Sequence, residues 1–234
     1  MRISHRYQFV FISIPRSGST SVRASLNDWS DLKDGPEDPF YHHVDCLSLK
    51  AEFEKEGWNW EKYYKFAFVR NPWDRVVSEY FRLKEKLNRN EWLINSSSYH
   101  DFTDWCERSP GEYQGEGIKK EIEDLKKQLV LNGNEKDRAA RKYLGQYRHL
   151  QNVWRNQISW LCDGDGKVLV NKIGRFETLV KDFKNICSTI GIRLSLGKHG
   201  KTERGNYRKY YNKDTREMVR KRFEQDVNVF DYHF

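Results

Sequence analysis

Residues 9–23 read FVFISIPRSGSTSVR, and this stretch decides the fold. Its first six residues are mostly aromatic or β-branched, which predicts a strand buried on both faces. Pro15 ends the strand, and the small polar residues 17–20 are of the kind that turn a chain sharply and cap a helix. Val22, Leu26 and Trp29 then recur at helical spacing. The stretch therefore predicts a strand, a tight loop and a helix in succession.

The tight loop after this strand has the composition of an anion site. Several backbone N–H groups converge at the start of a helix, and the helix dipole favours negative charge there. Arg16 adds a positive charge to the same loop. An ordinary strand–turn–helix has the same composition, so the loop alone supports the two interpretations equally.

A second strand–loop–helix follows in residues 65–81. The strand ends at Arg70, Asn71-Pro72 breaks it, and apolar residues then recur at helical spacing. Ser78 lies about two helical turns further on. Ligands of parallel sheets bind at the carboxyl ends of the strands. Two such loops side by side would hold two separate phosphate groups of one nucleotide.

The rest of the chain alternates further strands and helices. We predict a short strand from about residue 40 with a turn at Ser48, and a last helix that starts at a capping box of Asp214 and Glu217. The other predicted elements are helices at 49–55, 117–131, 139–161 and 179–190 and a strand at 168–170 that leads into 173–176. This alternation predicts a three-layer α/β domain around a central parallel sheet, with a P-loop-like strand–loop–helix nucleotide site. Residues 1–234 form a single domain in this interpretation, with a helical insertion at about 84–143.

The composition narrows the class of partner. The 234 residues carry a formal charge of +8, which favours polyanionic partners without choosing among them. The four cysteines are far apart and fit neither a zinc site nor a disulfide scaffold, so we expect a reducing compartment. The sequence shows no apolar run long enough to span a membrane and no signal peptide. We therefore expect a soluble, cytoplasmic protein.

Five segments of the sequence resemble a known family. They are IPRSGSTS at 14–21, FAFVRNPWDRVVSEY at 66–80, IGRFETL at 173–179, KTER at 201–204 and DVNVFDY at 226–232. The chain resembles the sulfotransferases that use PAPS, 3′-phosphoadenosine 5′-phosphosulfate. It is most similar to their carbohydrate branch, which includes the uronyl and heparan 2-O-sulfotransferases and the chondroitin and HNK-1 enzymes.

The resemblance implies how PAPS would be held. The 5′-phosphosulfate would lie on the first loop, formed by Arg16, Ser17, Gly18, Ser19, Thr20 and Ser21. Arg16 stands where relatives usually carry lysine, and it would neutralise charge on the bridging oxygen as the S–O bond breaks. Arg70 and Ser78 would hold the 3′-phosphate. A loop that closes over the cofactor would contribute Lys201, Thr202 and Arg204. The product is PAP, and no metal is expected.

The reaction would be in-line transfer of the sulfuryl group to an acceptor hydroxyl, which needs a general base near neutral pH. Histidine suits that role, and the resemblance points to His43, with His42 second. A carboxylate, Asp45 or Glu79, is the alternative base. The histidine pair could also have no catalytic role and only pack in the core or face solvent.

The acceptor is a carbohydrate hydroxyl by resemblance, with the insertion at 84–143 as its binding region. A small-molecule or lipid acceptor stays open. We expect no nucleic-acid partner and no stable insertion into a membrane.

Two other classes compete with a sulfotransferase. A P-loop kinase of a small substrate would need the G-x-x-x-x-G-K-[ST] pattern, but no glycine lies four residues before Gly18 and no lysine follows it. A non-catalytic basic module that binds polyanions would leave the pairing of Arg70 with Ser78 unexplained.

Overall fold

The computed structural model forms two compact units. The sheet unit comprises residues 1–75, 156–201 and 224–233, and the helical unit comprises 76–155, 202–223 and 234. The structure describes residues 1–33, 43–89, 99–112, 120, 122–124, 127, 136–197 and 204–234. The prediction of a single domain stays a prediction.

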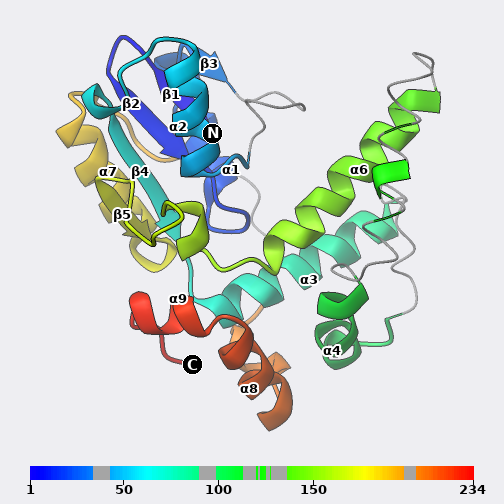
Figure 1. Cartoon of the computed structure of the whole chain (residues 1–234). Coiled ribbons are helices and arrows are strands. Elements are labelled where there is room, and N and C mark those ends of the chain that lie inside the picture. Colours follow the sequence, from blue (N-terminus) through cyan, green and yellow to red (C-terminus); the bar gives the residue numbers. More distant parts are fainter. Residues whose placement is uncertain are drawn as a thin grey trace. The chain divides into compact units, whose positions relative to one another are not determined.

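The sheet unit contains a five-stranded sheet in the order β3-β1-β2-β4-β5 (Figure 1). Its strands are β1 (Arg2–Ser4), β2 (Phe9–Ile12), β3 (Leu32–Lys33), β4 (Tyr64–Val69) and β5 (Lys172–Arg175). Strands β2, β4 and β5 are parallel, whereas β1 runs antiparallel to both β2 and β3. The α/β class is confirmed, but the prediction of a wholly parallel sheet is wrong. Only a short turn joins β1 to β2, and a parallel pair needs a crossover of about a dozen residues or more.

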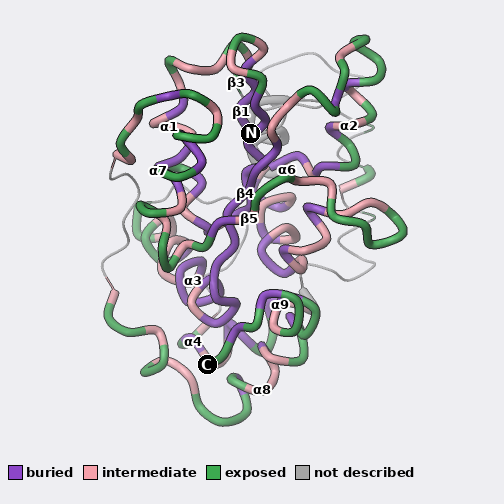
Figure 2. The backbone as a smooth tube through the Cα atoms, turned by 90° about the vertical axis from the view of Figure 1, so that its left-hand side faces the viewer, coloured by how far each residue is buried: buried purple, intermediate pink, exposed green. Residues whose placement is uncertain are grey.

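Helices cover both faces of this sheet. On one face, α1 (Ser19–Ser25) and α7 (Leu179–Thr189) share a buried core with aromatic side chains of β2 and β4, in which the Phe11 and Phe66 rings stack at 5.3 Å. On the other face, Lys65 points to the Trp60 ring, which packs edge-to-face at 5.0 Å against Phe53 of α2 (Cys46–Lys55). Figure 2 shows α1 and α7 on one side of the buried strands and α2 on the other.

The helical unit is built on aromatic packing. It contains α4 (Phe102–Glu112), α6 (Lys136–Val153), α8 (Lys213–Arg222) and, from Val76 on, most of α3 (Pro72–Asn88). The Trp154 ring packs against those of Trp105 at 5.3 Å and Phe223 at 5.9 Å, which links α4, the end of α6 and the end of α8. None of the helices in the described part of the chain has the length and apolarity needed to cross a membrane.

Several predicted boundaries are wrong, each for a local reason. Helix α2 begins at Cys46, not at residue 49, because the Asp45 carboxylate caps it by accepting from Ser48 N at 2.9 Å. Helix α8 is capped by Asn212 and Thr215 instead of Asp214 and Glu217.

Two longer elements also differ from their predictions. The helix predicted to run to residue 161 ends at Val153 and is followed by the short helix η3 (Ile158–Trp160). The strand predicted at 168–170 is reduced to a single bridge between Cys162 and Val168, and β4 pairs in parallel with β5 as well as with β2. The helix predicted at 117–131 lies mostly outside the described residues.

Candidate functional site

The loop after β2 makes a sharp, strained turn. Arg16 and Gly18 both have left-handed backbone conformations, with φ of 66° and 82°. That conformation is uncommon for a residue with a side chain, and such strain concentrates at functional sites. Ser17 Oγ donates to Ile14 O at 2.8 Å and closes the turn. At Gly18 a Cβ atom would lie 2.7 Å from Leu179 Cδ2, so the loop packs closely under α7.

The loop leads directly into the electropositive end of α1. Gly18 is the N-cap and has no side chain to cap the helix, and the first turn of α1 contains no acidic residue. Helix amides at such an end keep their partial positive charge. Ser17, Ser19 and Ser21 are buried beside this end, whereas Thr20 is exposed.

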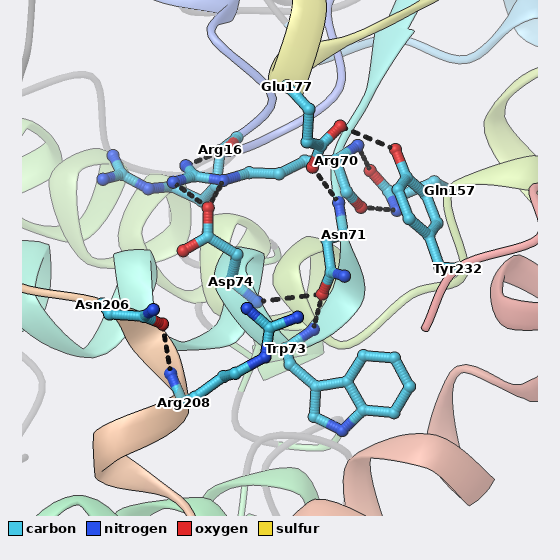
Figure 3. A network of polar contacts seen from close by, with 10 residues as sticks. All are labelled: Arg16, Arg70, Asn71, Trp73, Asp74, Gln157, Glu177, Asn206, Arg208 and Tyr232. Carbon is cyan, nitrogen blue, oxygen red and sulfur yellow. Dashed lines mark hydrogen bonds and ion pairs between the residues drawn. The ribbon is translucent and has the colours of Figure 1, made fainter. Parts of the chain in front are cut away.

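Arg70 connects the second predicted motif to the first (Figure 3). It is 5% exposed, and its Nη1 donates to Arg16 O at 2.9 Å. Its Nε and Nη2 both bind Asp74 Oδ2, at 2.8 and 2.7 Å, and its Cζ lies 3.8 Å from the centre of the Phe176 ring. The two loops meet because β2 and β4 are adjacent and parallel, so both strands end at the same edge of the sheet.

A second arginine, which the sequence analysis did not single out, also holds the loop. Arg75 is fully buried and donates from Nε to Pro15 O at 3.1 Å. Arg70 and Arg75 therefore fix two consecutive carbonyl groups of the loop. No local pattern in the sequence marked Arg75, because an arginine on a helix is usually exposed.

His43 lies at the same edge of the sheet. It is buried, and its Nδ1 lies 2.6 Å from Ser13 O, directly after β2. A carbonyl oxygen only accepts, so Nδ1 carries the proton and, in the neutral ring, Nε2 has the lone pair. Nε2 is the atom that would take a proton from the hydroxyl group of an acceptor substrate. The second candidate, His42, lies outside the described residues.

The two alternative carboxylates both have structural partners. Asp45 caps α2. Glu79 is fully buried in the helical unit, where Arg82 binds both its oxygens at 2.6 and 2.9 Å and His149 Nε2 lies 3.2 Å from each. Burial alone would raise the pKa of Glu79, but Arg82 and His149 outweigh it and hold that pKa well below its ordinary value. A carboxylate with such a low pKa is a poor general base.

We expect Glu79→Gln to lower the free energy of unfolding by about 3 kcal/mol at pH 7, because it removes the carboxylate that pairs with the largely buried guanidinium of Arg82. A carboxylate whose pKa is lowered by folding stabilises the protein above its unfolded pKa, here near 4.5, and loses that contribution as the pH falls below it. Urea unfolding between pH 3 and pH 7 should therefore show that the difference in the free energy of unfolding between Glu79→Gln and the unmodified protein becomes smaller as the pH falls. Glu85→Gln, on the same helix and in the exposed pair with Arg89, should change little. A Glu79→Gln penalty that does not depend on pH would contradict this account.

The other predicted cofactor residues are placed in the helical unit or are not described. Ser78 is buried on α3, and Arg204 is half-buried before the short helix η5 (Tyr207–Tyr210). Lys201 and Thr202 lie outside the described residues. The predicted contacts of these four residues with a cofactor stay predictions. Within the described ranges, His, Cys, Asp and Glu side chains form no group of three or more that could hold a metal ion.

The fold is α/β, and two arginines, Arg16 and Arg70, lie together at the carboxyl ends of adjacent parallel strands, the edge at which such sheets usually bind ligands. The comparison with protein families is more specific: the model of the sulfotransferase family matches residues 1–233, so this chain belongs to the sulfotransferase family. No curated protein and no solved structure matches it significantly. The predicted sulfotransferase family is thereby confirmed, and with it a transferase of sulfur-containing groups, whereas the use of PAPS and the carbohydrate branch stay predictions.

Proposed function

We propose that this protein transfers the sulfuryl group of PAPS to a hydroxyl group of a carbohydrate. Sulfotransferases generally use PAPS, which supports the choice of donor. The observation that carries the proposal is the 2.9 Å bond from Arg70 to Arg16 O, because it joins the two predicted phosphate-binding motifs at one edge of the sheet.

The residues at this edge fit the charges of PAPS. The molecule has two anionic ends, a 5′-phosphosulfate and a 3′-phosphate. Arg16 and Arg70 supply positive charge, and the first turn of α1 adds its amides without an acidic side chain to oppose them. Asp74 shares the guanidinium of Arg70, so a phosphate there would compete with this carboxylate. Arginine can bind an anion with a planar pair of donors, which a lysine cannot do.

The residues of this chain would act in distinct roles. Bound PAPS supplies the sulfuryl group and is released as PAP. Arg16 would stabilise the negative charge that develops on the oxygen left behind, and such electrostatic stabilisation is often the largest catalytic effect. His43 would take the acceptor proton on Nε2, while Ser13 O holds the ring through Nδ1. The turn, strained at Arg16, would fix the loop in place before the ligand arrives.

The carbohydrate acceptor rests on the resemblance of the motifs to the carbohydrate branch. Residues 84–143 are the proposed acceptor region. Sulfate transfer from labelled PAPS to a polysaccharide, measured against a lipid alcohol and a small phenol, tests this part. Transfer only to the lipid or the phenol would overturn the carbohydrate acceptor and keep the donor.

Ligand-induced stabilisation tests the donor. We expect PAP to raise the melting temperature more than 5′-AMP, ATP or heparin does, because PAP alone carries the 3′-phosphate together with a 5′-phosphate. A ligand at 100 times its Kd stabilises the folded state by about 2.7 kcal/mol. If PAP gives no larger shift than 5′-AMP, the use of PAPS is overturned. A shift with ATP and magnesium alone would favour a kinase, and a shift with heparin alone would favour a polyanion-binding module.

A further inference from the structure

The backbone of Arg70 is held by a buried glutamine amide. Arg70 N donates to Gln157 Oε1 at 2.9 Å, and Gln157 Nε2 donates to Arg70 O at 2.8 Å (Figure 3). Gln157 is fully buried. Arg70 directly follows the last residue of β4, so the Gln157 side chain supplies both hydrogen bonds to the Arg70 backbone at the point where the strand pairing ends. The direction in which the Arg70 side chain leaves the sheet is thereby fixed.

Asp226 in turn holds Gln157. Its Oδ2 accepts from Gln157 N at 2.7 Å and from Gln157 Nε2 at 3.2 Å, and its Oδ1 accepts from Ile158 N at 2.9 Å. Asp226 is fully buried in α9 (Glu224–Val229), close to the end of the chain. Because an acceptor occupies one amide proton of Gln157, the amide cannot flip, and its oxygen must face Arg70 N.

A second set of bonds fixes the next residue, Asn71. Glu177 Oε1 accepts from Asn71 N at 2.7 Å, and Tyr232 Oη donates to Glu177 Oε2 at 3.1 Å. Asn71 Nδ2 donates to His233 O at 2.8 Å. The segment 226–233 therefore reaches both residues that follow β4, through Gln157 and through Glu177.

Joining α9 to the sheet through a buried carboxylate costs free energy, because the charged group is removed from water. Burial raises the pKa of Asp226, and the nearby Arg75 with the hydrogen bonds from residues 157 and 158 only partly opposes this. Apolar side chains of similar size usually stabilise such a contact as well or better. What an apolar side chain cannot do is orient the amide of Gln157.

We propose that Asp226 and Gln157 are positioning residues that hold Arg70 for the 3′-phosphate of PAPS. The inference rests on the function proposed above. It assigns a role to the last of the five resembling segments, DVNVFDY at 226–232, which the catalytic and cofactor residues leave unused. Neither residue touches the cofactor in this scheme. Both act through the backbone of Arg70.

The test compares two Asp→Asn variants in the same segment. Asp226→Asn keeps the size of the side chain but turns one of its two acceptor oxygens into a donor, which then opposes an N–H group of Gln157 or of Ile158. Asp231→Asn makes the same change at a side chain that is 85% exposed and pairs with His233. We expect Asp226→Asn to weaken PAP binding about tenfold in calorimetry and 5′-AMP binding less than twofold, which corresponds to about 1.4 kcal/mol for PAP. Asp231→Asn should leave both affinities unchanged.

A second variant covers the case in which Asp226→Asn does not fold. Gln157→Met keeps the volume, removes both bonds to the Arg70 backbone, and leaves the bonds from the backbone amides of 157 and 158 to Asp226 intact. It should raise KM for PAPS about tenfold and change kcat less than twofold. A residue that only stabilises the fold would instead lower the active fraction, and hence the apparent kcat, without changing the preference for PAP over 5′-AMP.

Two further results distinguish a failure of the positioning role from a failure of the proposed donor. If the unmodified protein prefers PAP but Asp226→Asn and Gln157→Met keep that preference, the positioning role is overturned and the use of PAPS stands. If the unmodified protein does not prefer PAP over 5′-AMP, the proposed donor is overturned and the positioning role falls with it.

Discussion

Replacing His43 by alanine should lower kcat by about 10²–10⁴-fold, the usual contribution of a general base. The ring is held through Nδ1 by Ser13 O, and its Nε2 lone pair is the proposed proton acceptor. The affinity for PAP should stay within about twofold, because PAP has no acceptor hydroxyl for the base to act on. Steady-state rates with PAPS and calorimetry with PAP measure the two effects separately.

His233→Ala is the matched control for this variant. The His233 side chain is 84% exposed, so its loss should leave kcat unchanged. His42→Ala tests the second candidate of the pair. Full activity in both His43→Ala and His42→Ala would contradict a histidine base. The role would then pass to Asp45, because Arg82 and His149 hold the pKa of Glu79 too low for it to accept a proton near neutral pH.

Replacing Arg70 by alanine should weaken PAP binding about 100-fold and 5′-AMP binding much less. Hydrogen bonds to charged groups contribute about 1.5–3 kcal/mol each, and a guanidinium can make two of them to a phosphate. Arg70→Lys keeps the charge without the planar pair of donors, so we expect an intermediate loss. Calorimetry with both nucleotides measures the preference directly. Arg193→Ala, which removes an exposed arginine of the sheet unit, is the control.

An equal loss of PAP and 5′-AMP binding would contradict contact of Arg70 with the 3′-phosphate. Arg70 also donates to Arg16 O, so its removal in that case would act through the shape of the first loop. The melting temperature without ligand separates this effect from unfolding, since Arg70→Ala also leaves Asp74 without the ion pair.

The parts of the fold that could be predicted have strong local patterns. Strands β2 and β4 contain the apolar runs FVFI and FAFV, each followed by a break and then by a helical pattern, and both were recognised at nearly their observed bounds. Strand β1 has three residues, too few to show a pattern, and its absence from the prediction made the sheet look wholly parallel. Strand β5 was misplaced because Val168-Leu169-Val170 has a stronger β pattern than Lys172–Arg175.

Local sequence patterns identified the candidate site residues on the two loops, but they missed the residues that hold these loops in place. Arg16 and Arg70 each follow a strand end, where ligands of such sheets bind. Arg75, Gln157 and Asp226 lie in helical or irregular segments where a polar residue is usually exposed. Their burial became visible only when the segments that cover them were in place.

The sequence by itself determined two strand–loop–helix units, their order and the sulfotransferase family, because these depend on residues close together in the chain. Tertiary structure alone decided that Arg70 reaches the first loop and that His43 points to Ser13. It also brought Gln157 next to Arg70, 87 residues away in the sequence, and Asp226 next to Gln157, 69 residues away. Hydrophobic burial drives the chain to collapse without regard to such separations, and the polar partners that meet in the core are fixed by the packing of whole elements. No local pattern records those meetings.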